Sequence, residues 1–158
     1  MSRVQLALNV ADLDSAVGFY SRLFGAEPAK LRPGYANFAI AEPPMKLVLI
    51  ENKGAAGTVN HLGVEVATTD EVTSARERLS GTGLTTVAED GVTCCYAVQD
   101  KVWVHDTDGL DWEVYTVLAD AEVPAGRLRA DVSACGPGCC SAETETETAA
   151  VASAGDSA

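Results

Sequence analysis

An internal repeat is the feature of this sequence that most constrains its fold. Residues 4–10 and residues 61–67 both alternate apolar with polar side chains, which predicts two strands that each bury one face. A helix N-cap residue follows each run, and the interval from Asp12 to Thr68 is 56 residues. A period of this length predicts a duplicated module, because a solenoid needs at least three copies.

Each predicted strand leads into a helix that ends near a glycine, Gly25 in the first copy and Gly81 in the second. Further strand-like runs follow the helices at residues 35–41, 46–51, 94–98, 101–105 and 110–118. Turns at Gln99-Asp100 and at residues 106–109 separate the last three runs. We therefore expect an α+β fold built from two tandem βαβββ modules.

The repeat predicts the division of the chain into a folded part and a tail. Residues 1–120 are expected to form one domain, with modules at about 1–52 and 58–120. Residues 121–158 are expected to form a flexible, acidic, Cys-containing tail, rich in Ala, Gly, Ser and Thr from residue 126 onward. This composition cannot bury enough apolar surface to offset the entropy of ordering, so we expect the tail to be disordered.

Charge and hydropathy exclude several classes of partner. Of the 158 residues, 23 are acidic and 11 are basic, which gives a formal net charge of −12. Such a chain lacks the basic surface that nucleic acids and anionic membranes require, and no apolar run has the ~18 residues of a membrane helix. The N-terminus leads directly into a strand pattern and shows no signal-peptide core, so a cytoplasmic protein is expected. Its five cysteines, an odd number, are expected to be free and reduced.

The repeat also indicates a candidate metal site. Gln5 and His61 occupy equivalent positions in the two first strands, on the polar face that no helix covers. Two metal-capable side chains would thus project into one concavity between the copies. The alternative for His61 is a hydrogen-bonded residue of the core or rim.

Glu113 supplies the carboxylate that would complete such a site. It lies among bulky residues in the last predicted strand, where an unpaired charge would be costly, although a salt bridge would also explain it. Its counterpart in the first copy is expected to be Leu47, which offers no ligand. Gln5, His61 and Glu113 would form a nitrogen and oxygen donor set with open positions, which favours a catalytic Fe(II) or another first-row divalent ion.

Two adjacent cysteines, Cys94 and Cys95, indicate a second chemistry. Neighbouring strand residues point to opposite faces, so the two thiols converge only where the backbone is irregular, and the turn residues Glu89-Asp90-Gly91 lie just upstream. Residues 86–93 are a candidate mobile loop for the same reason. A disulfide between neighbours would be strained, whereas paired thiolates suit a trivalent metalloid or a soft metal ion. Two packed small hydrophobic residues are the alternative.

The sequence resembles the C–As lyase (ArsI/CadI-like) branch of the vicinal oxygen chelate superfamily, which includes glyoxalases and extradiol dioxygenases. The run Thr-Cys-Cys-Tyr-Ala-Val-Gln-Asp-Lys-Val-Trp-Val at 93–104 carries the resemblance most specifically, and Asp-Gly-Leu-Asp-Trp-Glu-Val-Tyr at 108–115 follows it. Asn-His-Leu-Gly-Val at 60–64 and the early segment 19–25 fit the same pattern. The match covers about residues 3–118.

This resemblance implies a vicinal oxygen chelate cup around Fe(II), and O2-dependent cleavage of the carbon–arsenic bond. The implied substrates are trivalent organoarsenicals such as methylarsenite and reduced aromatic arsenicals, and the product is arsenite. By position, His61 and Glu113 match metal ligands, and Cys94 and Cys95 match the arsenical-binding pair. Gln5 stands where relatives commonly have His, so another divalent metal such as Ni, Co, Mn or Zn can replace Fe(II) in a purified sample.

Other interpretations of the same residues remain open. One is a non-enzymatic thiol protein that sequesters arsenicals or cadmium, and another is a glyoxalase-type isomerase or thiol transferase with Zn(II) or Ni(II). The tail thiols Cys135, Cys139 and Cys140 would be either a flexible metalloid collector or dispensable. His105 is expected to be a surface residue at a strand end. The expected partners are a small organoarsenical and O2, with no nucleic acid or membrane, and the chain would be a monomer or homodimer.

Overall fold

The repeat in the sequence is also a repeat of structure. A computed structural model describes residues 2–122, so residues 123–158 of the predicted tail, with its three cysteines, lie outside the described residues. The first module contains β1 (Arg3–Val10), α1 (Leu13–Phe24), β2 (Lys30–Arg32), β3 (Tyr35–Ile40) and β4 (Met45–Glu51). A short 3-10 helix, η1 (Lys53–Ala55), connects it to β5 (Val59–Glu65), α2 (Thr69–Gly81), β6 (Thr86–Cys94), β7 (Ala97–His105) and β8 (Asp111–Asp120). The α+β fold of two βαβββ modules is thereby confirmed.

The helix caps explain where both helices begin. The Asp12 carboxylate accepts a 2.8 Å hydrogen bond from the backbone N–H of Ser15, and α1 ends at Gly25, which has a φ of 61°. Thr68 and Glu71 form a reciprocal capping box at the start of α2. These contacts satisfy the free N–H groups of the first helical turns, as the sequence pattern predicted.

All eight strands form one sheet in the order β2-β3-β4-β1-β5-β8-β7-β6. The two modules meet where β1 pairs antiparallel with β5, and Gln5 pairs with Gly63 while Ala7 pairs with His61. Adding 56 to either residue of module one gives its equivalent in module two, since 5 + 56 = 61 and 7 + 56 = 63. The two modules are therefore related by an approximate two-fold axis at the centre of the sheet, where β1 pairs with β5.

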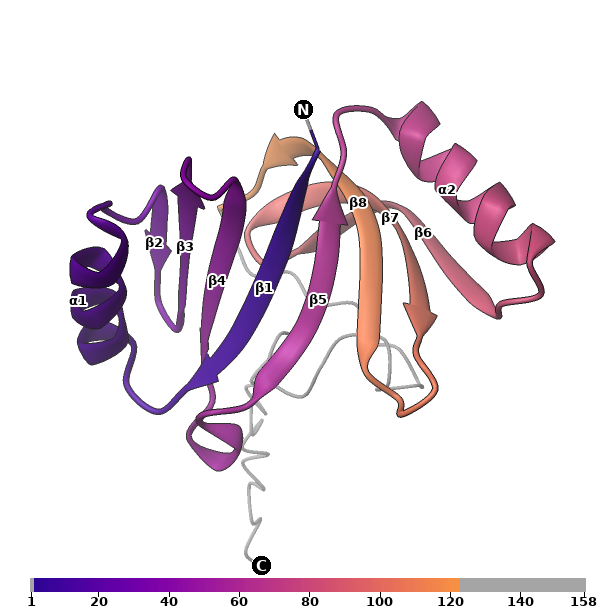
Figure 1. Ribbon diagram of the computed structural model, residues 1–158. Helices are drawn as coiled ribbons and strands as arrows, with labels where there is room; N and C mark the ends of the chain where they lie inside the picture. Colours follow the sequence, from indigo (N-terminus) through magenta and orange to yellow (C-terminus); the bar gives the residue numbers. More distant parts are fainter. Residues whose placement is uncertain (1, 123–158) are drawn as a thin grey trace, which may run out of the picture.

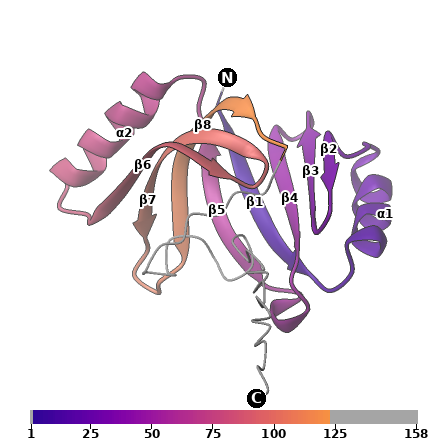
Figure 2. The same cartoon turned by 180° about the vertical axis from the view of Figure 1, so that it is seen from behind.

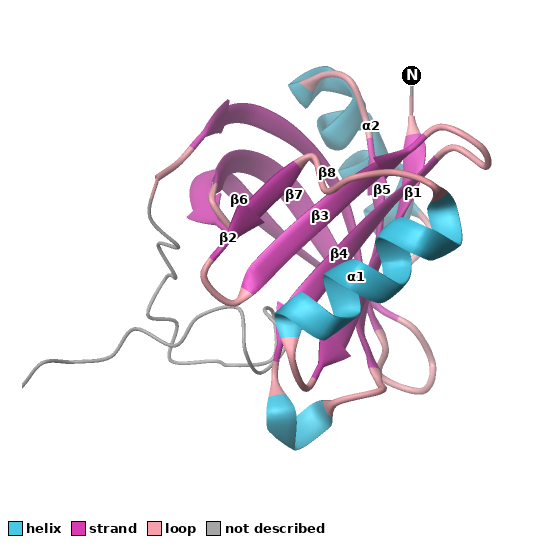
Figure 3. Ribbon diagram, turned by 90° about the vertical axis from the view of Figure 1, so that its left-hand side faces the viewer, coloured by secondary structure: helices cyan, strands magenta, loops and turns pink. Residues whose placement is uncertain are grey.

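The sheet curls into a half-barrel, with both helices on its outer side (Figure 1). The opposite view shows β6 and β7 bending over the inner side toward module one (Figure 2). Helix α1 lies across β3 and β4 (Figure 3), where buried apolar side chains gather at Leu13, Ala36, Phe38, Ile40, Leu47 and Leu49. A second cluster on the inner side contains Ala7, Tyr35, Val48, Ile50 and Tyr96. The helices thus fill the outer face, and the inner face remains for a site.

The strand boundaries in module two differ from the prediction. The expected turn at Gln99-Asp100 is wrong, because β7 runs without a break from Ala97 to His105. The chain reverses instead at Cys95 and Tyr96, which have φ values of 54° and 63°. A two-residue turn with two positive φ values matches the twist of the flanking strands, but it normally carries Asn or Gly. Cys95 and Tyr96 are not residue types that indicate such a turn, so the sequence pattern did not predict it.

Residues 86–93, the candidate mobile loop, belong to β6, which pairs antiparallel with β7. The Glu89-Asp90-Gly91 segment is a local irregularity inside this strand, where the pairing register shifts between Glu89 and Val92. The Gly91 N–H donates to the Asp100 carboxylate at 2.7 Å, and this bond stabilises the bend. The predicted turn at residues 106–109 does connect β7 to β8, and the Gly109 N–H donates to the Asp106 carbonyl there. Across residues 2–122, none of the helices is long and apolar enough to cross a membrane.

Candidate active site

The structure brings Gln5, His61 and Glu113 together on the inner face of the sheet. The Gln5 amide nitrogen lies 2.8 Å from Glu113 Oε1 and 3.0 Å from His61 Nε2. His61 Nε2 is 3.4 Å from the same carboxylate oxygen. All three residues are at least 95% buried, and they come from β1, β5 and β8, three neighbouring strands at the centre of the sheet.

Gly63 makes this close approach feasible. It pairs with Gln5 across the β1–β5 boundary and with Glu113 across the β5–β8 boundary. A Cβ atom on Gly63 would lie 3.1 Å from Glu113 Cγ and 3.3 Å from Gln5 Cβ, which is tighter than ordinary packing. A glycine at this position therefore leaves the space in which the two functional side chains converge.

The predicted counterpart of Glu113 in module one is wrong by one residue. Ala7 pairs with Val48, and its equivalent Gly63 pairs with Glu113, so Val48 is the equivalent position. Val48 lies on the inner face, whereas Leu47 packs under α1. A shift of one residue moves a strand side chain to the opposite face, and spacing in the sequence alone did not fix this register.

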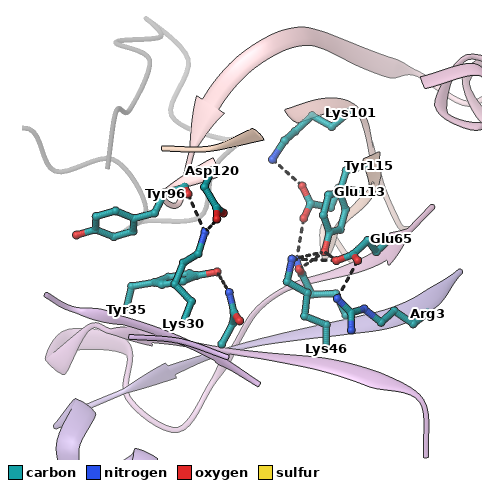
Figure 4. Close-up of polar contacts among 12 residues, drawn as sticks. Arg3, Lys30, Tyr35, Lys46, Glu65, Tyr96, Lys101, Glu113, Tyr115 and Asp120 are labelled. Atoms are coloured by element: carbon teal, nitrogen blue, oxygen red, sulfur yellow. Dashed lines mark hydrogen bonds and ion pairs between the residues drawn. The ribbon is translucent and has the colours of Figure 1, made fainter. Parts of the chain in front are cut away.

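Lys101 holds the Glu113 carboxylate in its charged form. Its ammonium donates to Glu113 Oε2 at 2.8 Å, and both side chains are almost fully buried (Figure 4). Burial by itself would raise the pKa of Glu113, but the adjacent Lys101 ammonium lowers that pKa to about 2. Burial would likewise lower the pKa of Lys101, and the Glu113 carboxylate raises it instead. One oxygen of Glu113 is thus committed to Lys101, while the other faces Gln5 and His61.

The Gln5 amide can adopt two orientations, and the Tyr115 hydroxyl can form a hydrogen bond with either of them. The Tyr115 hydroxyl lies within hydrogen-bond distance of Gln5 Oε1 and is 2.8 Å from Glu65 Oε2, yet it has one proton to donate. If the amide turns by 180°, Gln5 Nε2 donates to the Tyr115 oxygen, and the hydroxyl proton goes to Glu65 alone. Gln5 Oε1 then faces His61 Nε2 and Glu113 Oε1, which also bear lone pairs.

Three lone-pair donors that face one another in this way repel each other unless a cation lies between them. Oxygen and imidazole nitrogen donors with a single carboxylate suit a first-row divalent metal. Among residues 2–122, no three His, Cys, Asp or Glu side chains form a metal-binding cluster, so the amide of Gln5 is needed as the third donor. The donor set of this structure therefore fits a divalent metal ion when Gln5 presents its oxygen.

The two thiols lie at the tip of the β6–β7 hairpin. Cys94 Sγ and Cys95 Sγ are 3.2 Å apart, and both cysteines are reduced. The left-handed backbone at Cys95 and Tyr96 turns the neighbouring side chains toward each other, which a regular strand would not do. A left-handed conformation costs about 1–2 kcal/mol for each non-glycine residue. The irregularity that was predicted for a convergent thiol pair is thus at the tip itself.

Tyr96 fastens this tip to module one. Its buried ring lies 5.7 Å from that of Tyr35, and its hydroxyl donates to the Pro33 carbonyl at 3.1 Å. The Tyr96 carbonyl accepts from Lys30 Nζ at 3.0 Å (Figure 4). It also accepts from the Ala121 N–H at 3.0 Å. These contacts offset the backbone strain and hold the thiol pair over the inner face.

A single cavity joins the donor trio to the thiol pair. Its free volume is about 20 Å³, which is room for about one water-sized atom or ion. The lining residues include Gln5, His61, Glu113, Cys94, Cys95 and Lys101. Sequence analysis missed Lys101 and Tyr115, although Lys101 was visible as a charge within a predicted apolar strand. His105 ends β7 at the surface, as predicted, and pairs with Asp111.

Comparison with known proteins identifies the class to which this site belongs. A family model described as Glyoxalase/Bleomycin resistance protein/Dioxygenase superfamily matches residues 3–114, and the chain belongs to this superfamily. An extradiol ring-cleaving dioxygenase from B. fuscum has a similar fold, with a TM-score of 0.55 and 19% sequence identity. That likeness covers 76% of this chain and 34% of the dioxygenase.

Two curated relatives are much closer in sequence. The chain is 66% identical over 122 residues to the cadmium-induced protein CadI of Mycobacterium tuberculosis, covering 77% of this chain and 80% of that protein. It is 60% identical over 136 residues to the trivalent organoarsenical cleaving enzyme of Thermomonospora curvata, covering 85% of this chain and 88% of the enzyme. The family resemblance inferred from the sequence motifs is confirmed.

Proposed function

We propose that this protein is an enzyme that cleaves the carbon–arsenic bond of trivalent organoarsenicals, with Fe(II) and O2 as cofactor and co-substrate. The observation that carries the proposal is the shared cavity, whose lining includes a pair of thiols and an oxygen and nitrogen donor trio. The high identity to a trivalent organoarsenical cleaving enzyme supports it. Methylarsenite and reduced aromatic arsenicals are the proposed substrates, and arsenite is the product.

The thiol pair would bind the arsenic atom. An organoarsenous acid carries two hydroxyl groups, and two thiols can replace them to form two As–S bonds with release of two water molecules. Cys94 and Cys95 have their sulfur atoms 3.2 Å apart, so one arsenic atom can bridge them with little movement. Because Tyr96 fixes the tip, the remaining carbon substituent would keep one orientation within the cavity.

Gln5, His61 and Glu113 would hold the Fe(II) ion, which when bound would supply the O2 activation that this reaction requires. Lys101 keeps Glu113 ionised, and the Tyr115 oxygen would accept from the Gln5 amide nitrogen when the amide oxygen is turned toward the metal. The cavity walls would bring the arsenic substituent and the metal site close together and keep bulk water away from them. The contribution of the protein to the rate would be mainly proximity, orientation and electrostatics.

Arsenic speciation tests this proposal directly. Reduced protein is loaded anaerobically with Fe(II), mixed with methylarsenite or phenylarsenite, and divided into aerobic and oxygen-free samples. Arsenite formed only in the aerobic sample is the expected result. Intact but bound organoarsenical in both samples would contradict it and support a sequestering protein, whereas turnover without O2 would support an isomerase or transferase chemistry.

Matched cysteine variants show which thiols are needed for arsenical binding and turnover. Cys94→Ser and Cys95→Ser are expected to stop arsenical capture and turnover. The control is a triple variant, Cys135→Ser, Cys139→Ser and Cys140→Ser, which removes three thiols outside the proposed site and should leave turnover unchanged. Loss of activity only in the triple variant would assign capture to the tail.

A further inference from the structure

We propose that a hydrogen-bond relay through Asn60, Asn9 and Thr58 fixes the tautomer of His61 and presents its Nε2 lone pair to the metal site. This inference rests on the proposed role of His61 as a metal ligand. The relay residues are positioning residues that lie behind the imidazole and do not line the cavity.

The relay has four hydrogen bonds, and each is short. His61 Nδ1 lies 2.7 Å from Asn60 Oδ1, and Asn60 Nδ2 donates to Asn9 Oδ1 at 2.9 Å. Asn9 Nδ2 donates to the Thr58 hydroxyl at 2.9 Å, and that hydroxyl donates to the Ala55 carbonyl at 2.7 Å. The side chains of the relay thus connect a buried imidazole to a backbone carbonyl of η1.

The last bond sets the direction of all the others. A backbone carbonyl can only accept, so the Thr58 hydroxyl must use its proton there and accept from Asn9. The Asn9 amide is thereby oriented with its oxygen toward Asn60, and the Asn60 amide with its oxygen toward His61. His61 Nδ1 must then carry the hydrogen, because an unprotonated nitrogen would face another acceptor. A neutral imidazole with hydrogen on Nδ1 has its lone pair on Nε2.

A β-bulge makes this relay feasible in the strand. Ala7 pairs with His61 and Leu8 pairs with Val59, so Asn60 has no pairing partner on β1. Alternation along a regular strand would send the Asn60 and His61 side chains to opposite faces, whereas a bulge places both on one side. The extra residue therefore brings the Asn60 amide against the His61 ring.

The relay serves His61, and Gln5 in module one has no equivalent of its first member. By the period of 56 residues, the counterpart of Asn60 is Val4, which is 51% exposed and apolar. The counterpart of His61 is Gln5, whose amide contacts the Tyr115 hydroxyl instead. The imidazole of module two is thus oriented by Asn60 of its own strand and, through it, by Asn9 of β1 in module one.

The first test is nitrogen NMR of the histidine rings in metal-free wild-type protein at about pH 8.5, well above the usual imidazole pKa of about 6.5. The expected result is that His61 carries its hydrogen on Nδ1 and none on Nε2. His105, which lies outside the relay, provides the internal comparison. A hydrogen on Nε2 of His61, or an even mixture of tautomers, overturns the proposal without any variant.

The second test measures divalent metal binding by anaerobic titration with Fe(II) and Co(II). Asn60→Leu is expected to weaken metal binding about 10–100-fold, the usual effect of losing a residue that orients a ligand, and to give mixed His61 tautomers. Asn60→Asp retains an acceptor for Nδ1–H and is expected to restore most of the affinity. Thr58→Val should have a smaller effect in the same direction.

Asn37→Ala is the matched control, because it removes an amide bonded to the Tyr35 hydroxyl elsewhere in the sheet. Unchanged metal affinity in Asn60→Leu, or an equal loss in Asn37→Ala, contradicts the relay. Methylarsenite binding by the thiols should be unchanged in all four variants. Wild-type protein that binds metal with the expected tautomer but does not cleave methylarsenite would refute the proposed function and leave the relay intact.

Discussion

The two modules share one fold but contribute unequally to the cavity. Module one supplies the single donor Gln5 and an apolar wall that includes Val48 and Tyr35. Module two supplies His61, Glu113 and both thiols. Duplication therefore provides a two-fold scaffold, and the chemistry depends on how far one copy departs from the other.

The largest expected effect is the loss of arsenical affinity when the Cys94 thiol, which has no counterpart in module one, is removed. Cys94→Ser should lower the affinity for phenylarsenite more than 100-fold, roughly what losing one of two bonds to arsenic entails. Fe(II) binding should stay within about twofold of wild type, because the donor trio is untouched. Calorimetric titration with each ligand measures both affinities, and normal phenylarsenite binding by this variant would remove the thiols from the site.

The two buried lysines provide the next comparison. Lys101→Met leaves Glu113 buried without its partner and should lower the free energy of unfolding by about 3–5 kcal/mol. Lys46→Met, in module one, should cost about 1–2 kcal/mol, because Glu65 is less deeply buried and retains Arg3 at 2.8 Å. Urea denaturation of metal-free protein measures both losses. Equal losses would show that the two ion pairs are energetically equivalent.

Acid should destabilise the protein mainly by protonating Glu113, a residue of module two. The pKa of Glu113 is lowered from 4.5 to about 2, so its ionisation stabilises the fold above about pH 4.5 and this contribution is lost as the pH falls toward 2. The contribution is about 3 kcal/mol. Urea denaturation of metal-free protein at about pH 6 and about pH 3 should show a loss of about 2 kcal/mol, because the folded carboxyl is still mostly ionised at pH 3. A Lys101→Met/Glu113→Leu double variant should show a much smaller loss, and an unchanged pH dependence would assign acid sensitivity to other carboxyls.

The smallest effect is expected at the centre of the two-fold arrangement. Gly63→Ala should destabilise the protein by about 1–3 kcal/mol and weaken metal binding, since the new Cβ would lie 3.1 Å from Glu113 Cγ. The equivalent exchange in module one, Ala7→Gly, should cost about 1 kcal/mol through backbone entropy and leave metal affinity unchanged. Equilibrium unfolding and Co(II) titration of both variants make the comparison. Identical metal affinities would show that Gly63 has no role at the site.

The sequence was sufficient to predict the parts of the fold that follow from local pattern. Alternation identified β1 and β5, and the capping residues Asp12 and Thr68 identified the starts of both helices. The convergence of Gln5 and His61 followed from the repeat, because equivalent residues of paired modules meet near the two-fold axis. That prediction needed only the period and the polarity of each position, whereas Glu113 was inferred from its charge among bulky residues in the last strand and from the family resemblance.

The parts that were missed depend on tertiary context. Gln99 and Asp100 have the composition of a turn, but pairing with β6 and β8 keeps them in a strand. Cys95 and Tyr96 adopt left-handed backbone that their side chains do not favour, and contacts with module one hold them there. Tyr115 shares a strand with Glu113, but its link to the Gln5 amide joins residues 110 positions apart. Local patterns contain no information on such contacts.

The anchoring of Tyr96 has a consequence for folding. The thiols belong to module two, but the ring and the hydroxyl that hold their turn in place bind module one at Tyr35 and Pro33. A chain in which only one half has folded would lack this anchor, and its two sulfur atoms would return to the divergent directions of an ordinary strand. If the two sulfur atoms bind arsenic as proposed, substrate binding therefore requires that both modules have folded and docked.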